Sequence, residues 1–294
     1  AKMPIDNTRV EPTKPETSTE EFNTIIENEF LVAARSPLST FSIDVDAASY
    51  SILRRKLMER NAIPADAIRL EEMINYFPYN YPDATAEQPF SVQTEMSDCP
   101  WDSSHVLLKI GIQGKKIDTE KQPPSNLVFL IDVSGSMQSM DKLPLVQKSL
   151  KLLVNQLKPD DQVALVVYAG SAGLVLPSTP AVNKQKIIDA IEQLEAGGST
   201  AGGAGIHLAY KTALESFKKE GNNRVILCTD GDFNVGVSSE NELVNLIEEK
   251  RKSGVFLSVL GFGTGNYKDS RMEQLADKGN GNYAYIENEK EAQK

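Results

Sequence analysis

The stretch "LVFLIDVSGSMQSM", residues 127–140, joins an apolar run to a polar turn. Residues Leu127–Asp132 are almost entirely apolar, which is typical of a central strand buried on both faces of a parallel sheet. Asp132, Ser134 and Ser136 follow at alternate positions, and a glycine between the two serines permits a tight backbone turn. We therefore expect a buried strand whose carboxyl end presents one acidic and two hydroxyl side chains to the same side.

Downstream of this stretch, predicted strands and helices alternate almost without exception. The pattern indicates an α/β fold with a doubly wound, mostly parallel sheet flanked by helices. In such sheets, ligands bind beyond the carboxyl ends of the strands, where the strand order reverses. The predicted strands are Gln162–Tyr168, Gly173–Leu176, Arg224–Thr229, Val255–Gly261 and Asn282–Ile286, and the predicted helices are Lys142–Leu157, Lys184–Leu194, Ile206–Lys219, Glu240–Lys252 and Ser270–Asp277.

The composition divides the chain into four segments. Residues 1–35 are rich in Pro, Thr, Glu and Asn and predict a mostly flexible tail. Residues 36–122 predict a small α+β or β-sandwich module. Residues 123–287 carry the alternating pattern, and residues 288–294 are interpreted as a truncated junction.

Within the N-terminal module, the pattern predicts two helices and three strands. We expect a strand at Thr40–Val45 and a helix capped by Asp46, with apolar residues at helical spacing at Tyr50, Leu53, Leu57 and Met58. A second short helix follows. Two further strands are expected at Phe90–Met96 and His105–Gln113, the second alternating well enough for a sheet with one buried face.

Charge and hydropathy exclude several classes of partner. The 31 Lys and Arg residues stand against 41 Asp and Glu residues, so the net charge is −10. This balance argues against nucleic acids and anionic lipid surfaces, because both attract cationic patches. No apolar run approaches the roughly 18 residues of a membrane-spanning helix. Cys228 lies in an apolar run, which predicts a buried free thiol, and a disulfide with Cys99 is the less favoured alternative.

Three polar loops with glycines are expected to converge on one edge of the sheet: Asp132–Met137, Gly197–Gly205 and Thr229–Gly236. The second contains Thr200 in "GGSTAGG", and the third places Asp230 directly after a strand in "CTDGD". Hard oxygen ligands of this kind suit Mg²⁺, Mn²⁺ or Ca²⁺ and suit zinc poorly. Taken alone, the first loop has a second interpretation, in which its acid and serines cap the next helix.

In these loops the sequence resembles the von Willebrand factor type A domain family over roughly residues 123–287. The metal-ion-dependent adhesion site of that family combines D-x-S-x-S after the first strand, a Thr in the second loop and an Asp, often in T-D-G, after the fourth strand. All five positions match in order and spacing, with about 65 residues to the Thr and about 30 more to the Asp. They are Asp132, Ser134, Ser136, Thr200 and Asp230.

The resemblance implies a single divalent cation, most simply Mg²⁺, at the edge of the sheet. By this similarity, Ser134 and Ser136 ligate the cation directly, Thr200 directly or through water, and Asp132 and Asp230 through water or directly. One coordination position is left for an Asp or Glu carboxylate from a protein partner.

The N-terminal module resembles that of a bacterial subgroup of these proteins, in "LSTFSIDVDAASYSILRRKL" and "AIRLEEMINYFPYNYP". Members are typically secreted or lipid-anchored, which implies a periplasmic or extracellular place in the cell envelope and an anchor upstream of this chain. The resemblance also implies a C-terminal module that would complete the N-terminal one.

We therefore expect a metal-ion-dependent protein-binding module of a bacterial cell-envelope protein, without enzymatic activity. A metal-assisted phosphoester hydrolase is an alternative, although no general base or phosphate-binding cation stands near the loops, and Lys142 is expected to be solvated. A scaffold with a purely structural metal is another. Asp44 and Asp46 in "SIDVDAAS" are interpreted as structural, with Asp46 as a helix cap. His105 and His207 are interpreted as structural or exposed, and Trp101 as a core and packing residue.

Overall fold

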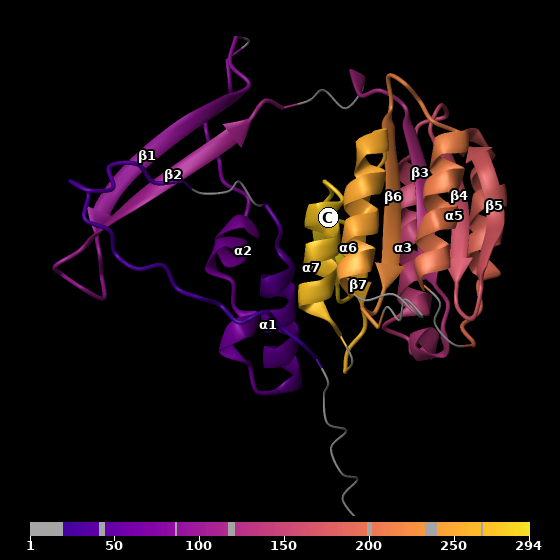
Figure 1. Cartoon of the computed structure of the whole chain (residues 1–294), viewed down its shortest axis with the longest axis horizontal. Helices are drawn as coiled ribbons and strands as arrows, with labels where there is room; N and C mark the ends of the chain where they lie inside the picture. The colour runs from indigo at the N-terminus through magenta and orange to yellow at the C-terminus, as the bar shows by residue number, and fades with distance from the viewer. Residues whose placement is uncertain are drawn as a thin grey trace, which may run out of the picture.

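The computed structural model describes residues 20–40, 45–85, 87–116, 121–198, 202–232, 240–265 and 267–294 (Figure 1). Its main body is a six-stranded sheet in the order β5-β4-β3-β6-β7-β8. All neighbouring strands are parallel except β5, which runs antiparallel to β4. The strands are β3 (Ser125–Asp132), β4 (Gln162–Tyr168), β5 (Ala172–Pro180), β6 (Asn222–Thr229), β7 (Phe256–Phe262) and β8 (Tyr283–Ile286).

The doubly wound, mostly parallel sheet predicted from the sequence is confirmed. The strand order reverses at β3, which has β4 on one side and β6 on the other. Seven of the eight residues of β3 are buried, as its apolar run predicted. The carboxyl ends of β3 and β6 therefore meet at the point where the topology predicts a ligand site.

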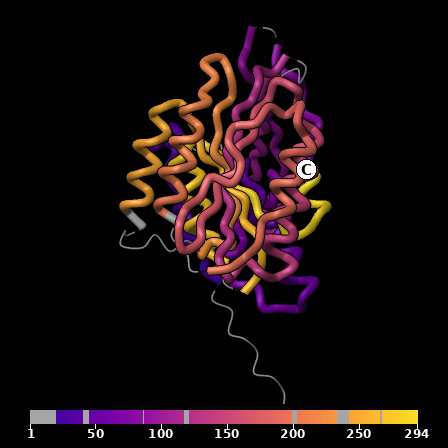
Figure 2. Tube along the Cα trace, turned by 90° about the vertical axis from the view of Figure 1, so that its right-hand side faces the viewer, coloured from indigo at the N-terminus to yellow at the C-terminus, as the bar shows by residue number. Residues whose placement is uncertain are grey.

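Helices cover both faces of the sheet and form a separate core with each face (Figure 2). Along β3, Val128 and Leu130 point to one core, whereas Leu127, Phe129 and Ile131 point to the other. The first core is covered by α5 (Gly202–Glu215), α6 (Glu240–Lys250) and α7 (Asp269–Lys278). The second core is covered by α3 (Leu143–Gln156), α4 (Lys184–Glu192) and α8 (Glu289–Ala292). Short 3-10 turns lie between elements: η3 (Gly135–Gln138), η4 (Ala181–Asn183) and η5 (Arg251–Ser253).

Two elements of the main body differ by four residues from their predicted bounds. Helix α5 begins at Gly202, inside the glycine-rich segment that was expected to form a loop up to Gly205. A Cβ at Gly205 would lie 2.9 Å from Tyr168 Cβ and 3.1 Å from Leu130 Cδ1. The lack of a side chain at Gly205 therefore allows α5 to pack closely against β3 and β4. Strand β5 extends to Pro180 instead of Leu176, because it follows β4 along its whole length.

The N-terminal module contains α1 (Ala48–Glu59), η1 (Ala65–Ala67), α2 (Leu70–Asn75) and the antiparallel pair β1 (Phe90–Asp98) and β2 (Val106–Gly114). The predicted strand Thr40–Val45 falls largely on 41–44, outside the described residues. The prediction that Asp46 caps α1 was wrong. Its Oδ1 instead accepts a hydrogen bond from the Tyr283 backbone N–H, 3.1 Å away, and so joins α1 to the edge strand β8.

The buried face of α1 also differs from the face that the apolar spacing predicts. Leu57 and Met58 are exposed, and the helix buries Ile52, Arg55 and Lys56. Both basic residues are bonded to Glu20, with Arg55 Nη2 at 2.8 Å and Lys56 Nζ at 2.5 Å. The helix therefore docks through ion pairs, which hydrophobic periodicity does not reveal.

A second buried ion-pair cluster fixes α2 to the main body. Arg69, at the start of α2, is bonded to Glu72 on its own helix and, at 2.5 Å, to Asp269 at the start of α7. Asp269 is fully buried and also accepts a hydrogen bond from the Tyr283 hydroxyl at 2.7 Å. Glu273 lies 3.8 Å from Arg69.

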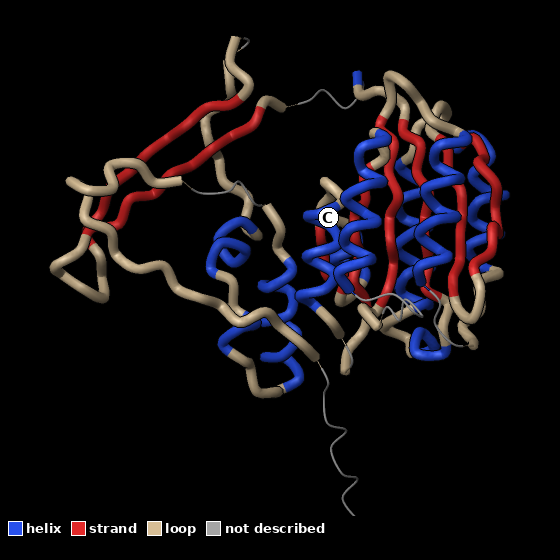
Figure 3. Tube along the Cα trace, viewed as in Figure 1, coloured by secondary structure: helices blue, strands red, loops and turns tan. Residues whose placement is uncertain are grey.

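The β1–β2 hairpin lies apart from the six-stranded sheet (Figure 3). One of its faces is apolar and exposed, although one buried face had been expected. Trp101, in the turn between the strands, is 77% exposed, so its predicted place in a core was wrong. Cys99 and Cys228 are both free, as favoured, and Cys228 is buried as predicted; Cys99 is buried as well. None of the helices in the described ranges is long and apolar enough to cross a membrane.

Candidate metal centre

The first and third predicted loops meet at the carboxyl edge of the sheet. Asp132 is the last residue of β3, and Asp230 follows β6 directly. Because the two strands are parallel neighbours, their ends lie side by side. Both carboxylates are fully buried. The structure therefore brings together the two acidic residues that the sequence singled out.

The Asp132 carboxylate receives three hydrogen bonds from three different elements. Its Oδ1 accepts from the Ser134 backbone N–H at 2.9 Å. Its Oδ2 accepts from the Tyr168 hydroxyl and from the Thr229 hydroxyl, each at 3.1 Å. Burial raises the pKa of this carboxyl, as does the neighbouring Asp230 carboxylate, and the hydrogen bonds from Ser134 and Tyr168 lower it by less. The network fixes the carboxylate and leaves it little freedom to bind a cation except through water.

The two serines form the solvent-facing part of the site. Ser134 is buried and Ser136 is exposed, and their Oγ atoms lie 3.1 Å apart. They belong to the turn leading into and through η3, so two neutral oxygens stand next to two buried acids. Hydroxyl oxygens at this spacing are suitable ligands for a small, hard cation.

The glycine-rich second loop begins against the first. The Gly135 N–H donates to the Gly198 carbonyl at 3.0 Å, and the Gly197 N–H donates to the Val133 carbonyl at 2.7 Å. Thr200 itself lies outside the described residues. Its assignment to the site stays a prediction, and the contacts of Gly197 and Gly198 place the start of its loop beside the serines.

Asp230 carries an ion pair that the sequence did not predict. Lys142 Nζ donates to Asp230 Oδ2 at 2.9 Å, and the lysine side chain is only 8% exposed. The prediction of a solvated lysine at the start of α3 was therefore wrong. The other carboxylate oxygen of Asp230 accepts from the Asp232 backbone N–H at 3.0 Å.

The charges of the site fit a cation. Within the described part of this edge, two buried carboxylates lie near one buried ammonium group, so these three groups carry a net negative charge when both acids are ionised. An isolated buried charge is costly, and a bound cation removes that cost. Among the described residues, no three His, Cys, Asp or Glu side chains form a metal-binding group by themselves. The donor set is thus two acids with hydroxyls, which suits Mg²⁺, Mn²⁺ or Ca²⁺.

Sequence reasoning did not identify Tyr168, Thr229 or Lys142 as parts of this site. Tyr168 and Thr229 are the last residues of β4 and β6, so their position at a carboxyl end was the available signal. The burial of Lys142 had no such signal, because it depends on a loop more than 100 residues away.

Comparisons with known proteins agree with this fold. The chain is 47% identical over 268 residues to the Escherichia coli protein YfbK, and the match covers 89% of this chain and 47% of YfbK. It is 29% identical over 190 residues to the Synechocystis protein sll0103, covering 65% of this chain and 44% of that one. The chain thus spans about half the length of these curated relatives.

The comparison with solved structures supports the fold. A von Willebrand factor type A structure from Catenulispora acidiphila superposes with a TM-score of 0.51 at 17% identity, covering 70% of this chain and 47% of that chain. A family model described as von Willebrand factor matches residues 16–109, which include most of the N-terminal module. The model of the von Willebrand factor type A domain, a protein-interaction module that commonly binds a divalent cation, matches residues 126–294. The chain therefore belongs to the von Willebrand factor type A domain family.

Proposed function

We propose that this chain is a metal-ion-dependent protein-binding module that holds Mg²⁺, or a similar hard cation, and binds a partner carboxylate through it. The observation that carries the proposal is the pair of buried acids, Asp132 and Asp230, placed at adjoining strand ends beside two serine hydroxyls. Both acids lie where the strand order reverses.

Each residue has a role that follows from its surroundings. The Ser134 and Ser136 hydroxyls are the direct ligands, because they are neutral and Ser136 faces solvent. Asp132, already bonded to three donors, acts through water and holds the first loop in place. Asp230 supplies the second negative charge, and Thr200 belongs to the same ligand set by the family resemblance. With few direct carboxylates, the bound cation keeps enough charge to attract an Asp or Glu side chain.

The proposal assigns no enzymatic activity to the chain. Hydrolysis of a phosphoester needs a general base and a cation for the phosphate. Lys142 is bonded to Asp230, and both histidines, His105 and His207, are exposed. Release of phosphate from a generic phosphoester in Mg²⁺, lost in the Ser136→Ala variant, would favour the hydrolase instead.

We place the module in the cell envelope of a bacterium, periplasmic or extracellular. The support is the resemblance of the N-terminal module to a secreted or lipid-anchored bacterial subgroup and the similarity to YfbK from Escherichia coli. Fractionation of the native host into cytoplasm, membranes and periplasm tests this placement, and a purely cytoplasmic protein would contradict it.

The experiment for the proposed function compares two serine variants. Ser136→Ala removes an exposed donor, so it leaves the fold intact and is expected to weaken Mg²⁺ or Mn²⁺ binding in calorimetry at least about ten-fold. Ser171→Ala, an exposed serine in the loop after β4, is the matched control. The immobilised chain is then used to capture envelope proteins in Mg²⁺ and in EDTA. A partner bound equally in both conditions, or equally by Ser136→Ala, would overturn the proposal.

A further inference from the structure

Lys142 reaches into the candidate metal centre from the residue that precedes α3. Its ammonium group donates to Asp230 Oδ2 at 2.9 Å, and the whole residue is 6% exposed. A lysine at a helix start is ordinarily solvated, and burying its charge is costly unless a carboxylate compensates it. The position of the ammonium group is therefore specific to the pairing with Asp230.

The loop after β7 is shaped around this lysine. Gly263 has a φ of +84°, and a Cβ at that position would lie 2.4 Å from both Cγ and Cε of Lys142. The aliphatic part of the lysine thus occupies the space that any other residue at position 263 would fill. Next to it, the Thr264 hydroxyl donates to Asp141 Oδ2 at 3.1 Å, which ties the same loop to the residue preceding Lys142.

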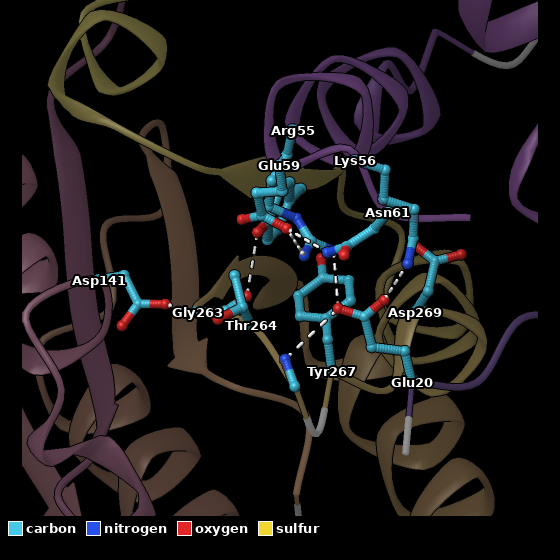
Figure 4. A network of polar contacts seen from close by, with 12 residues as sticks. Glu20, Arg55, Lys56, Glu59, Asn61, Asp141, Gly263, Thr264, Tyr267 and Asp269 are labelled. Carbon is cyan, nitrogen blue, oxygen red and sulfur yellow. Dashed lines mark hydrogen bonds and ion pairs between the residues drawn. The ribbon is translucent and has the colours of Figure 1, made fainter. Parts of the chain in front are cut away.

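Glu20, which precedes the N-terminal module, contacts that loop from its other side and joins it to α1 (Figure 4). The Gly265 N–H donates to Glu20 Oε1 at 3.4 Å, and Glu20 is bonded to Arg55 and Lys56 of α1. The Tyr285 hydroxyl donates to the Gly263 carbonyl at 3.0 Å. A chain of contacts therefore runs from the loop beside Lys142 through Glu20 to α1 of the module.

From this geometry we infer that Lys142 is an affinity-determining residue of the metal centre, an internal counter-cation that competes with the divalent ion for Asp230. The inference rests on the proposed function, because it concerns the affinity of that same site. In the metal-free protein the ammonium group compensates a buried carboxylate and stabilises the fold. When a divalent cation binds, the same positive charge opposes it and weakens its binding.

The two effects have opposite signs, which separates this role from ordinary packing. Removing the charge leaves Asp230 buried without its ammonium partner, so the metal-free protein becomes less stable. The same removal increases the negative charge available to the cation, so metal affinity rises. A residue that only packed the loop would, on removal, lower both stability and affinity.

The first test is Lys142→Met, which keeps the length of the side chain and removes its charge. Calorimetry with Mg²⁺ and with Mn²⁺ is expected to give an affinity at least about ten-fold higher than that of the unsubstituted chain, equivalent to about 1.4 kcal/mol. The thermal midpoint in EDTA is expected to fall, and the rise on adding Mg²⁺ to be larger. Lys151→Met, on α3 and in a surface ion pair with Glu192, is the matched control and should change neither quantity.

The second test moves the lysine without changing its charge. Gly263→Ala places a methyl group where Lys142 runs, so it should displace the ammonium group and raise metal affinity as Lys142→Met does. Gly265→Ala is the control, because its φ of +87° carries the same backbone strain but its Cβ would meet nothing within 4 Å. This pair keeps the inference testable if Lys142→Met does not fold.

The outcomes distinguish the inference from the proposed function. If the unsubstituted chain binds divalent cations and Lys142→Met binds them equally or more weakly, the inference is overturned and the function stands. If only Lys142→Met and Gly263→Ala bind them, the inference is supported. If no variant binds Mg²⁺ or Mn²⁺ at millimolar concentration, both are overturned.

Discussion

The buried cluster around Arg69 yields a prediction whose size follows from the structure. Arg69→Leu removes the cation that is bonded to Glu72 and Asp269, two carboxylates that are 1% and 0% exposed. Loss of one partner of a buried ion pair typically costs about 3–5 kcal/mol. Asp269 keeps its bond from Tyr283, and Glu72 keeps a bond from the Ser49 N–H at 2.8 Å. We therefore expect the low end, about 3 kcal/mol.

The pH dependence of this loss has a definite sign. Burial raises the pKa of Glu72 above its usual value, and Arg69 acts against that rise. Without Arg69 the pKa of Glu72 rises further, so the carboxyl takes up a proton more readily as the pH falls. Protonation removes part of the uncompensated buried charge. The free energy lost on substitution should thus be largest above neutral pH and smaller near pH 5.

The assay is urea unfolding followed by far-ultraviolet circular dichroism near pH 8 and near pH 5. Arg251→Leu is the control, because the Arg251 guanidinium donates to Asn280 at the surface and its removal should cost less than about 0.5 kcal/mol. A loss below about 1 kcal/mol for Arg69→Leu, or an equal loss at both pH values, would refute the reasoning.

Three further predictions concern stability and association. Burial raises the pKa of Glu273 to about 7, so this residue's contribution to folding stability is full below about pH 4.5 and is lost as the pH rises to about 7. The free energy of unfolding of Glu273→Gln, relative to that of the parent chain, should therefore increase by about 2 kcal/mol as the pH rises across that window. Urea unfolding at the two ends of the window measures this difference. Gly205→Ala should cost about 1–3 kcal/mol in thermal unfolding, because its methyl group would press on Tyr168, and a neutral result would contradict the packing. The exposed apolar face of the β1–β2 hairpin should promote self-association. The double variant Met96→Glu with Leu108→Lys, which places two charges on paired positions of that face, should lower the mass measured by light scattering at high concentration. A parent chain that is already monomeric would contradict this prediction.

The fold could be predicted because its main signals are local. The apolar run of β3 and the alternation of strands and helices determine a doubly wound sheet. Parallel topology then brings the ends of neighbouring strands together, which is why Asp132 and Asp230 could be paired from the sequence. Ser134 and Ser136 follow from their spacing to Asp132. Thr200 stays a prediction.

The remaining features depend on contacts between distant segments. Lys142 is buried because Gly263 leaves room for it, and no pattern near residue 142 shows this. Helix α1 buries Arg55 and Lys56 because Glu20 compensates their charge, so its apolar spacing pointed to the wrong face. In both cases a charge is buried by a partner far along the chain, which periodicity cannot detect.

The two free cysteines lie in two different parts of the molecule. Cys99 lies at the end of the β1–β2 hairpin and is 5% exposed, and Cys228 lies in β6 and is fully buried. Burial raises the pKa of the Cys228 thiol far above its usual value, so it reacts only when the sheet opens. Each thiol is thus a native reporter for the opening of one part. Rates of alkylation at the two positions, resolved by mass spectrometry, would give the opening equilibrium of the hairpin and that of the sheet separately, in one sample and without any substitution.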